Sequence, residues 1–361
     1  MVTMLDCIKR IPQILDGIIE DRKTNASRLL SGIADVKDTI DEIIFVGSGT
    51  SSTSALTARS FIERNVGIRA SVYVPNDFCH NKKCLNPNAL YVFTSQTGTS
   101  IETRSAMKLV KDLGYPCLGI TESQDTPLAK EAPVHWNMGC GYEEYPMRTI
   151  GYSASVMCQM LIGLEIGLAK GTVGSMEYDA LIRQAQQLPS SIESIIEKTL
   201  EWAEHSKWNM LRSQCLIFVG ADTIYGAALE AALKTWEILQ KPSIGYELEE
   251  SLHGPNYGYD SNHCVIVLND GGRENSKALA LGRYMEEVIG NGFVIGAQVA
   301  HDQDLRLDLK SGCFSALELM SSAQALIYRL TVDLGRDLLA PQNHAVMESY
   351  FKTHDEVAGV Q

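Results

Sequence analysis

The chain has 361 residues, enough for two domains of ordinary size, and its net charge is −13. This acidic balance argues against nucleic acid as the main partner, because phosphate backbones bind basic surfaces. Small phosphorylated ligands stay open, since backbone N–H groups and hydroxyls hold a phosphate without net positive charge.

The cysteines and the hydropathy pattern are typical of a cytoplasmic protein. Nine cysteines at irregular spacings fit reduced thiols better than a disulfide framework. The group Cys79, His80 and Cys84 lacks the second pair of a zinc site, so no metal is expected. No stretch approaches the ~20 apolar residues that span a membrane, and the charged N-terminus is not a signal peptide. We expect neither a membrane nor nucleic acid as a partner.

An amphipathic helix is predicted at the N-terminus. Helical spacing places its apolar residues on one face: Leu5, Ile8, Ile11, Leu15 and Ile18. That face must bury against the chain's own body or against a second subunit.

Strand-like and helical segments alternate after this helix. Short apolar runs predict strands at 43–46, 70–74, 90–93, 117–120 and 134–137. Helices are predicted at 54–64, 101–113 and 151–169. This alternation is the βαβ pattern of a parallel sheet.

A second unit follows a helical stretch at 175–210 and repeats the pattern. Residues 216–223 echo residues 43–50, with six of eight positions identical or similar. Strands at 265–269 and 292–295 flank a helix that ends near 289. Repetition at this scale predicts a duplicated α/β unit rather than a solenoid.

The predicted fold is therefore α/β, with two tandem doubly wound parallel-sheet domains. The expected boundaries are 1–35 for the N-terminal helical segment, 36–200 and 201–340 for the domains, and 341–361 for a C-terminal tail. The tail begins at the turn Pro341-Gln342-Asn343.

The strongest local motif is the hydroxyl-rich segment 94–100, which follows one strand and precedes a helix. Ser95, Thr97 and Ser100 can donate to phosphate oxygens at the positive end of that helix. Gly98 allows the backbone to approach closely. The alternative is an ordinary helix cap with surface hydroxyls.

A second hydroxyl-rich turn, residues 47–52, follows the first predicted strand. It has neither the Gly-Lys-Ser/Thr of a Walker A loop nor the third glycine of a dinucleotide fold. Both turns fall at strand ends, where doubly wound sheets bind ligands. The counterpart at 268–273 in the second unit has no Ser or Thr, so that unit is expected to keep the fold and lose the phosphate site.

Charged residues at helical spacing stand out in the second unit. Glu230, Lys234 and Glu237 lie close to one helical stripe, which is also typical of a solvated helix face. His253 follows sixteen residues later, before Gly254-Pro255, in a turn of the kind that positions catalytic groups. A lone histidine is more often structural.

These residues together resemble the sugar isomerase (SIS) domain family. The resemblance is to the isomerase half of glucosamine-6-phosphate synthase and to fructosamine-6-phosphate deglycases, and it extends over nearly the whole chain. It rests on segments 49–51, 95–100, 228–237 and 253–255. The synthase's glutamine-hydrolysing domain is absent, so we expect no use of glutamine as an ammonia source.

The resemblance implies a role for each matched residue. The phosphate-binding residues would be Ser51, Ser95, Gln96, Thr97 and Ser100. Glu237 would move a proton between C1 and C2 of the open-chain sugar, and His253 would assist ring opening at a neighbouring subunit's site. The family pattern thus implies a homodimer with shared sites. Lys234 can stabilise negative charge on the enediol or enaminol oxygen.

Two departures from the synthase pattern bear on the substrate. A tail lysine of the synthase corresponds to Val346 here, which favours a deglycase, whose substrate already carries the amine. The segment 141–149 also differs, and its Glu143, Glu144 or Arg148 either selects the amine substituent or lies in a surface loop. Further substrate-binding candidates are Gly49, Thr50 and Arg148.

The leading hypothesis is a phosphosugar isomerase/deglycase acting on a 6-phosphofructosamine without metal or organic cofactor. Glu237 would transfer the proton and water would hydrolyse the resulting imine. One alternative is an aldose–ketose phosphosugar isomerase or an amino-sugar-phosphate deaminase, which would use the same base. The other is a phosphosugar-binding regulator without catalysis.

Overall fold

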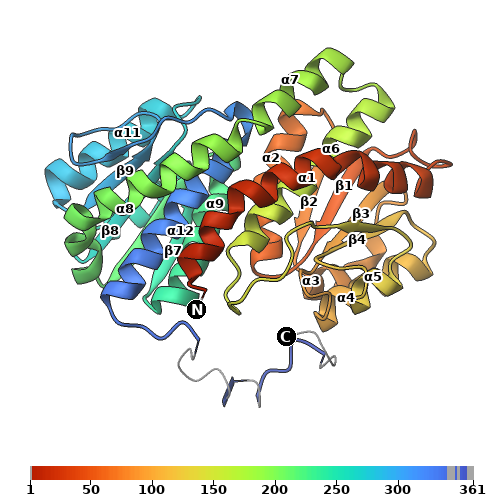
Figure 1. Ribbon diagram of the computed structural model, residues 1–361, viewed down its shortest axis with the longest axis horizontal. Helices are drawn as coiled ribbons and strands as arrows, with labels where there is room; N and C mark the ends of the chain where they lie inside the picture. Colours follow the sequence, from red (N-terminus) through yellow and green to blue (C-terminus); the bar gives the residue numbers. More distant parts are fainter. Residues whose placement is uncertain (1, 340–345, 348–349, 356–361) are drawn as a thin grey trace. The chain divides into compact units, whose positions relative to one another are not determined.

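The computed structural model describes residues 2–339, 346–347 and 350–355 (Figure 1). The chain forms two units. Unit 1 comprises Met1–Gln13, Glu144–Thr149 and Arg183–Pro341, and unit 2 comprises Ile14–Glu143, Ile150–Ile182 and Gln342–Gln361. Each contains a five-stranded parallel sheet, as the sequence predicts. The domain boundaries given above remain a prediction, and the turn expected at 341–343 lies outside the described residues.

The sheet of unit 2 has the order β2-β1-β3-β4-β5. Its strands are β1 (Glu42–Val46), β2 (Arg69–Tyr73), β3 (Ala89–Thr94), β4 (Cys117–Thr121) and β5 (His135–Asn137). All residues of β3 and β4 are buried. A parallel strand covered on both faces needs apolar side chains at every position, which is why continuous apolar runs predicted these strands correctly.

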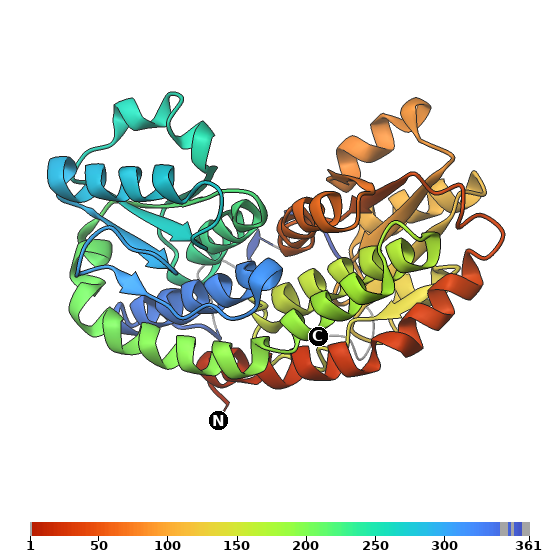
Figure 2. The same ribbon diagram turned by 90° about the horizontal axis from the view of Figure 1, so that it is seen from above.

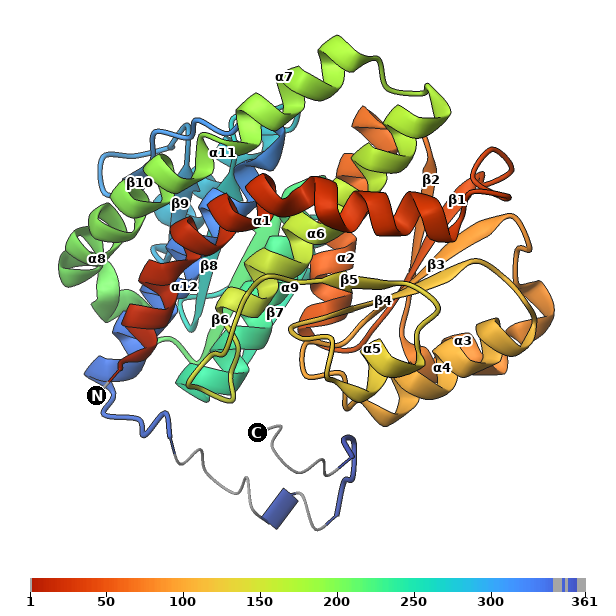
Figure 3. The same cartoon turned by 45° about the vertical axis from the view of Figure 1, so that its right-hand side comes forward.

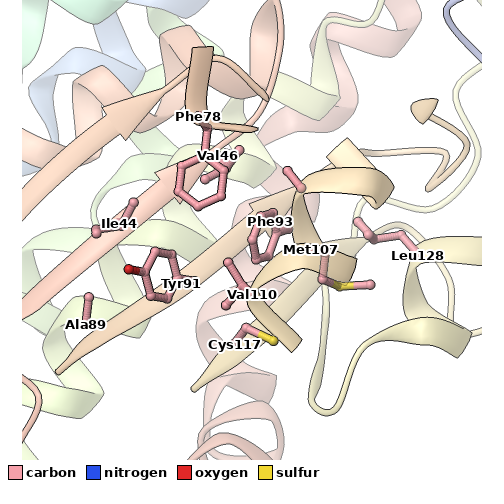
Figure 4. Close-up of a cluster of buried hydrophobic side chains, with 11 residues drawn as sticks. Ile44, Val46, Phe78, Ala89, Tyr91, Phe93, Met107, Val110, Cys117 and Leu128 are labelled. Carbon is pink, nitrogen blue, oxygen red and sulfur yellow. The ribbon is translucent and has the colours of Figure 1, made fainter. Parts of the chain in front are cut away.

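Helices cover both faces of this sheet. α3 (Pro75–His80), α4 (Ile101–Asp112) and α5 (Pro127–Glu131) gather on one face (Figure 3). α2 (Thr50–Asn65) and α6 (Ile150–Lys170) pack together on the other. Side chains of the sheet meet those of α3, α4 and α5 in an apolar core (Figure 4). The core holds Ile44, Val46, Phe78, Ala89, Tyr91, Phe93, Ala106, Met107, Val110, Cys117 and Leu128.

The sheet of unit 1 has the order β10-β9-β8-β6-β7. Its strands are β6 (Cys215–Gly220), β7 (Ser243–Glu247), β8 (His263–Asn269), β9 (Gly292–Gly296) and β10 (Leu305–Arg306). α11 (Asn275–Tyr284) covers one face, and α8 (Leu188–Arg212) and α12 (Ser315–Asp333) lie on the other (Figure 2). The remaining helices and short turns are α7 (Ser175–Ala185), α9 (Thr223–Lys234), α10 (Leu248–Ser251), η1 (Lys82–Cys84), η2 (Thr235–Leu239), η3 (Pro255–Gly258), η4 (Met285–Ile289) and η5 (Gly312–Phe314).

The two sheets share one topology, which confirms the predicted duplication of the fold. Read from the other edge, β7-β6-β8-β9-β10 repeats β2-β1-β3-β4-β5. The residues before α2 and α9 also match: Gly49 has φ 57° and ψ −127°, and Asp222 has φ 55° and ψ −123°. A backbone of this kind is natural for glycine and strained for aspartate.

The predicted N-terminal helix is α1 (Met4–Gly32), and its apolar face lies against the chain's own body. Ile8, Ile11 and Leu15 are fully buried there. One expectation was wrong: α6 is long and apolar enough to cross a membrane. However, 89% of its most apolar window is buried, as in the core helix of a soluble protein.

Candidate active site

Unit 2 carries the predicted phosphate-binding residues on two loops that follow neighbouring strands. One loop follows β1 and the other follows β3, and these strands pair from Glu42↔Ala89 to Val46↔Phe93. β2 pairs with the opposite side of β1. From β1 the chain continues to β2 on one side, and from β3 it continues to β4 on the other side, so the direction of the connections reverses between β1 and β3. This is the topological switch point at which open α/β sheets bind their ligands.

The loop between β3 and α4 turns its hydroxyls toward one another. Ser95 is buried and donates to Oγ of Ser100 at 3.0 Å. The hydroxyls of Thr97 and Thr99 lie 2.8 Å apart. α4 begins directly after Ser100. The loop thus places four hydroxyls before the positive end of a twelve-residue helix.

Gly98 is required by the shape of this loop. Its φ is 67°, in the left-handed region that favours glycine. A Cβ at this position would lie 2.6 Å from the side chain of Thr126, the N-cap residue of α5. Neither condition tolerates a larger residue, so the sequence of the loop is set by its close packing.

The side chain of Gln96 carries a donor with no acceptor. Its Nε2 is buried and has no hydrogen-bond partner within the described part of the chain. An unsatisfied buried donor costs about 1–3 kcal/mol. An anion in the loop would remove that cost, which fits the predicted phosphate-binding role.

The turn between β1 and α2 is equally tight. A Cβ on Gly47 would meet the side chain of Ser51 at 2.6 Å and the carbonyl oxygen of Thr94 at 3.1 Å. The turn therefore approaches the end of β3 closely. Gly49 and Thr50 open α2, and Ser51 is half-buried in its first turn. The predicted phosphate residues of both loops thus lie at adjacent strand ends.

The corresponding place in unit 1 has different chemistry. The ends of β6 and β8 line a cavity of about 20 Å³, roughly the room of one water molecule. Asp222 and Arg273 form an ion pair there at 3.4 Å. Charged side chains stand where unit 2 has hydroxyls, and the loss of the phosphate site in the repeat stays a prediction.

Unit 1 brings together the three charged residues that the helical spacing predicted to lie on one stripe. Lys234 Nζ lies 3.4 Å from Glu230 Oε1 and also forms an ion pair with Glu237. The side chains of Glu230 and Lys234 are 0% and 1% exposed, whereas that of Glu237 is 33% exposed. Only Glu237 therefore combines a buried cationic partner with access from solvent.

The helix changes its winding at this point. α9 ends at Lys234, and Thr235–Leu239 continues as a π-helical turn that ends at Gln240 with φ 54°. π-helical turns are rare and are frequent at functional sites. Lys234 is thus the last residue of α9 and Glu237 lies within the π-helical turn, a change of winding that the sequence did not predict.

Lys234 stays charged despite its burial. Burial works to lower the pKa of Lys234, but the neighbouring carboxylates of Glu230 and Glu237 outweigh it and raise the pKa. Removing a charge partner from such a site is costly. The lysine thus places a positive charge beside the partly exposed carboxylate of Glu237.

His253 lies on a separate exposed loop of unit 1. It follows α10, and its side chain is 66% exposed. Its Nδ1 lies 2.9 Å from the carbonyl oxygen of Glu249. Tyr257, four residues on, is 91% exposed. Both side chains project from the fold without packing into the core of unit 1.

The candidates in segment 141–149 differ in surroundings. Glu143 is buried and accepts backbone hydrogen bonds from Ile150 and Gly151, so it anchors the start of α6. Glu144 pairs with Arg10. Arg148 is half-buried in the segment that belongs to unit 1. The two carboxylates therefore have structural partners. A substrate-binding role of Arg148 stays a prediction.

Sequence reasoning did not include Glu230 among the site residues. Its position four residues before Lys234 indicates an ion pair on a helix, but the sequence does not indicate that Glu230 is completely buried. Within the described residues, no group of three or more His, Cys, Asp or Glu side chains is arranged to hold a metal ion.

Comparisons with known proteins agree with this architecture. Residues 39–162 match the model of the SIS domain. A glutamine–fructose-6-phosphate aminotransferase (isomerizing) of Haemophilus ducreyi is 26% identical over 347 residues, which cover 93% of this chain and 56% of that protein. The chain thus spans little more than half the length of this curated relative.

Two solved structures share the fold. One is a Clostridium difficile 630 protein described as a candidate phosphosugar isomerase, with a TM-score of 0.86, 24% identity, and coverage of 97% of this chain and 99% of that one. The other is the C-terminal domain of glucosamine-fructose-6-phosphate aminotransferase from Francisella tularensis, with a TM-score of 0.84, 21% identity, and coverage of 94% and 98%. Residues 39–162 are thus similar to the SIS domain, and the chain is similar over most of its length to the aminotransferase of Haemophilus ducreyi and to the C-terminal domain of that of Francisella tularensis.

Proposed function

We propose that the protein is a phosphosugar isomerase/deglycase that acts on a 6-phosphofructosamine, a fructose 6-phosphate with an amine at C1. The observation that carries the proposal is the Glu230–Lys234–Glu237 cluster, in which a half-exposed carboxylate lies beside a buried ammonium. A base for proton transfer must reach substrate, and Glu237 has that access.

The reaction divides among the candidate residues as follows. The loops after β1 and β3 bind the sugar phosphate through Ser51, Ser95, Gln96, Thr97 and Ser100, with Gly49 and Thr50 in the adjoining turn. His253 assists ring opening. Glu237 takes a proton from C1, which gives an enaminol whose oxygen is stabilised by Lys234.

Reprotonation at C2 then moves the double bond to C1 and nitrogen. The product is an imine of the aldose 6-phosphate. Water adds to this imine and releases the free amine and the aldose 6-phosphate. The C2 carbonyl oxygen accepts the electron pair when C1 loses its proton, and the nitrogen lone pair forms the C1–N double bond when C2 is protonated, so these steps need no metal or organic cofactor. We propose a cytoplasmic homodimer as the active form, with His253 serving the partner subunit.

Product analysis tests the proposal directly. Purified protein is incubated with several 6-phosphofructosamines, with fructose 6-phosphate and with glucosamine 6-phosphate, and sugar phosphates and free amines are quantified. The proposal expects equal amounts of amine and aldose 6-phosphate from a fructosamine. Conversion of the simple sugars alone would move the protein to an isomerase or deaminase. Binding without any turnover would make it a regulator.

Replacement of the base provides the mechanistic test. Glu237→Gln keeps the shape but not the charge, and turnover should fall by roughly 10²–10⁴. Glu287→Gln is a matched control, because Glu287 also lies on a π-helical turn of unit 1 and is 59% exposed. Turnover that is equal in both variants would contradict the role of Glu237.

A further inference from the structure

A segment near the C-terminus lies on the phosphate loop of unit 2. Ser100 and His354 form an antiparallel β-bridge. The backbone N–H of Ile101 donates to Thr353 at 3.2 Å, and that of Asp355 donates to Thr99 at 3.0 Å. Residues 353–355 thus lie along the loop through one isolated bridge and two backbone hydrogen bonds, although they are more than 250 positions away in the sequence.

An ion pair holds this segment in place. Arg104, in the first half of α4, pairs with both Glu131 of α5 and Asp355. The hydrogen bond with Glu131 raises the pKa of Arg104 above its ordinary value, and the charge of Asp355 raises it too. The side chain of Arg104 is 24% exposed and that of Asp355 is 42% exposed. The pair therefore links the C-terminal segment to the helix that follows the phosphate loop.

The bridge brings an imidazole to the hydroxyls of the loop. His354 Nε2 lies 3.4 Å from Ser100 Oγ, which accepts a hydrogen bond from Ser95. His354 Nδ1 lies 2.9 Å from the hydroxyl of Thr353. A continuous chain of polar atoms runs from the buried Ser95 to the exposed ring.

We propose that His354 is a phosphate-binding residue and that the Arg104–Asp355 pair positions it. The inference rests on the phosphate site of the proposed function. The loop itself offers hydroxyls, amides and backbone N–H groups, and a ring nitrogen adds a donor that suits an anion. The acidic groups nearby are Asp355 and Glu131, both paired with Arg104, and Glu102 in the first turn of α4.

Calorimetric titration of the full chain with fructose 6-phosphate and with inorganic phosphate tests the proposal. His354→Ala should weaken the binding of both probes about three- to tenfold, as for an exposed hydrogen bond to a charged group. His354→Gln, which keeps an N–H near the position of Nε2, should recover part of this loss. His205→Ala is the control, since His205 is an exposed histidine of α8 in unit 1, and should bind like wild type.

The positioning pair has its own readout. Asp355→Asn should weaken phosphate binding in the wild-type background and have no further effect in His354→Ala, because it acts through the histidine. If Asp355→Asn weakened phosphate binding by the same factor in both backgrounds, its effect would not act through His354, and the positioning role would be contradicted.

The outcomes separate this inference from the proposed function. Unchanged or tighter binding by His354→Ala would overturn the inference, tighter binding meaning that the segment blocks the loop. Phosphate binding that depends on His354, without turnover of any sugar phosphate, would overturn the proposed function alone. A wild-type protein that binds neither probe would overturn both.

Discussion

Lys234 is a buried cation whose charge is matched by two carboxylates of different exposure. Glu230 is completely buried, and its carboxylate lies 3.4 Å from Nζ of the lysine, so it compensates the buried ammonium. Glu237 is one-third exposed and keeps partial solvation. The same pair of contacts therefore serves two purposes: one carboxylate holds the lysine charged, and the other stays available for chemistry.

Removal of the lysine should destabilise the fold strongly. Lys234→Met removes the cationic partner of the buried carboxylate of Glu230, and the free energy of unfolding should fall by about 3–5 kcal/mol. The double variant Lys234→Met/Glu230→Gln should recover much of this loss, because no buried charge remains. Urea denaturation measures both, and Lys277→Ala, which breaks an exposed ion pair with Glu249, is a control expected to cost at most about 1 kcal/mol.

The same pair gives a pH dependence with a definite sign. A raised pKa of Lys234 in the folded state stabilises the protein at every pH below the ordinary lysine value of 10.5, and this contribution is lost as pH rises above it. Wild type should therefore lose stability more steeply than the double variant as pH rises above 10.5. Parallel curves for the two proteins would contradict a charged buried lysine.

At the scale of elements, the phosphate loop depends on a glycine for two separable reasons. Gly98 has φ 67°, and a Cβ added there would lie 2.6 Å from the side chain of Thr126. Gly114 has φ 73°, and a Cβ added there would meet nothing within 4 Å. The two glycines share a backbone conformation and differ in the space around them. Comparison of their alanine variants isolates the effect of packing.

Gly114→Ala should cost about 1 kcal/mol through backbone strain alone. Gly98→Ala should cost more, because Thr126 must shift, and it should also weaken phosphate binding by displacing the loop. Thermal unfolding and titration with inorganic phosphate check both statements. Equal destabilisation by the two variants, with unchanged phosphate binding, would show that a Cβ at position 98 fits beside Thr126 and would contradict this prediction.

The elements that the sequence predicted best are the central strands. β3 and β4 are buried along their whole length, so each position had to be apolar and the run was visible. β7 was missed because three of its residues are half-buried and one is exposed, and β10 because it has two residues. Strands at a sheet edge carry mixed side chains and little pattern.

The candidate site was predictable where it consists of local motifs and unpredictable where it depends on tertiary contacts. Hydroxyls and charged residues at fixed spacing marked the loops and the stripe of Glu230, Lys234 and Glu237. The π-helical turn at Thr235–Leu239 has no local sequence signal, because it depends on tertiary packing. The contact of His354 with Ser100 joins residues 254 positions apart, a separation over which no periodic pattern extends.

At the scale of the whole molecule, two units of one topology carry different polar side chains at equivalent places. Both units have the same strand order and the same switch point. Unit 2 carries the hydroxyl loops there, and unit 1 has the Asp222–Arg273 ion pair at the equivalent place and the Glu–Lys cluster on α9. Asp222 has the same backbone conformation as Gly49, so the two turns have the same shape although their side chains differ.

The proposed sharing of sites between subunits can be tested by complementation. His253 and Tyr257 are exposed on one loop, as expected for side chains that reach a second copy of the chain. Glu237→Gln and His253→Ala should each be nearly inactive alone. If His253 serves the partner's Glu237, a mixed dimer of the two variants contains one intact site and one site that lacks both residues. Random mixing makes half of the dimers mixed, so activity should return to about a quarter of the wild-type level.

Coexpression of the two variants with different affinity tags, followed by tandem purification, isolates the mixed dimer and should give about half of the wild-type activity per dimer. If both residues instead serve the same subunit's site, every site in the mixed dimer lacks one residue, and activity stays at the level of the single variants. A chain that elutes as a monomer, with full activity at any dilution, would contradict the shared site without regard to the variants. Complementation thus reports on the origin of His253 independently of which sugar phosphate is the substrate, provided that one substrate is turned over.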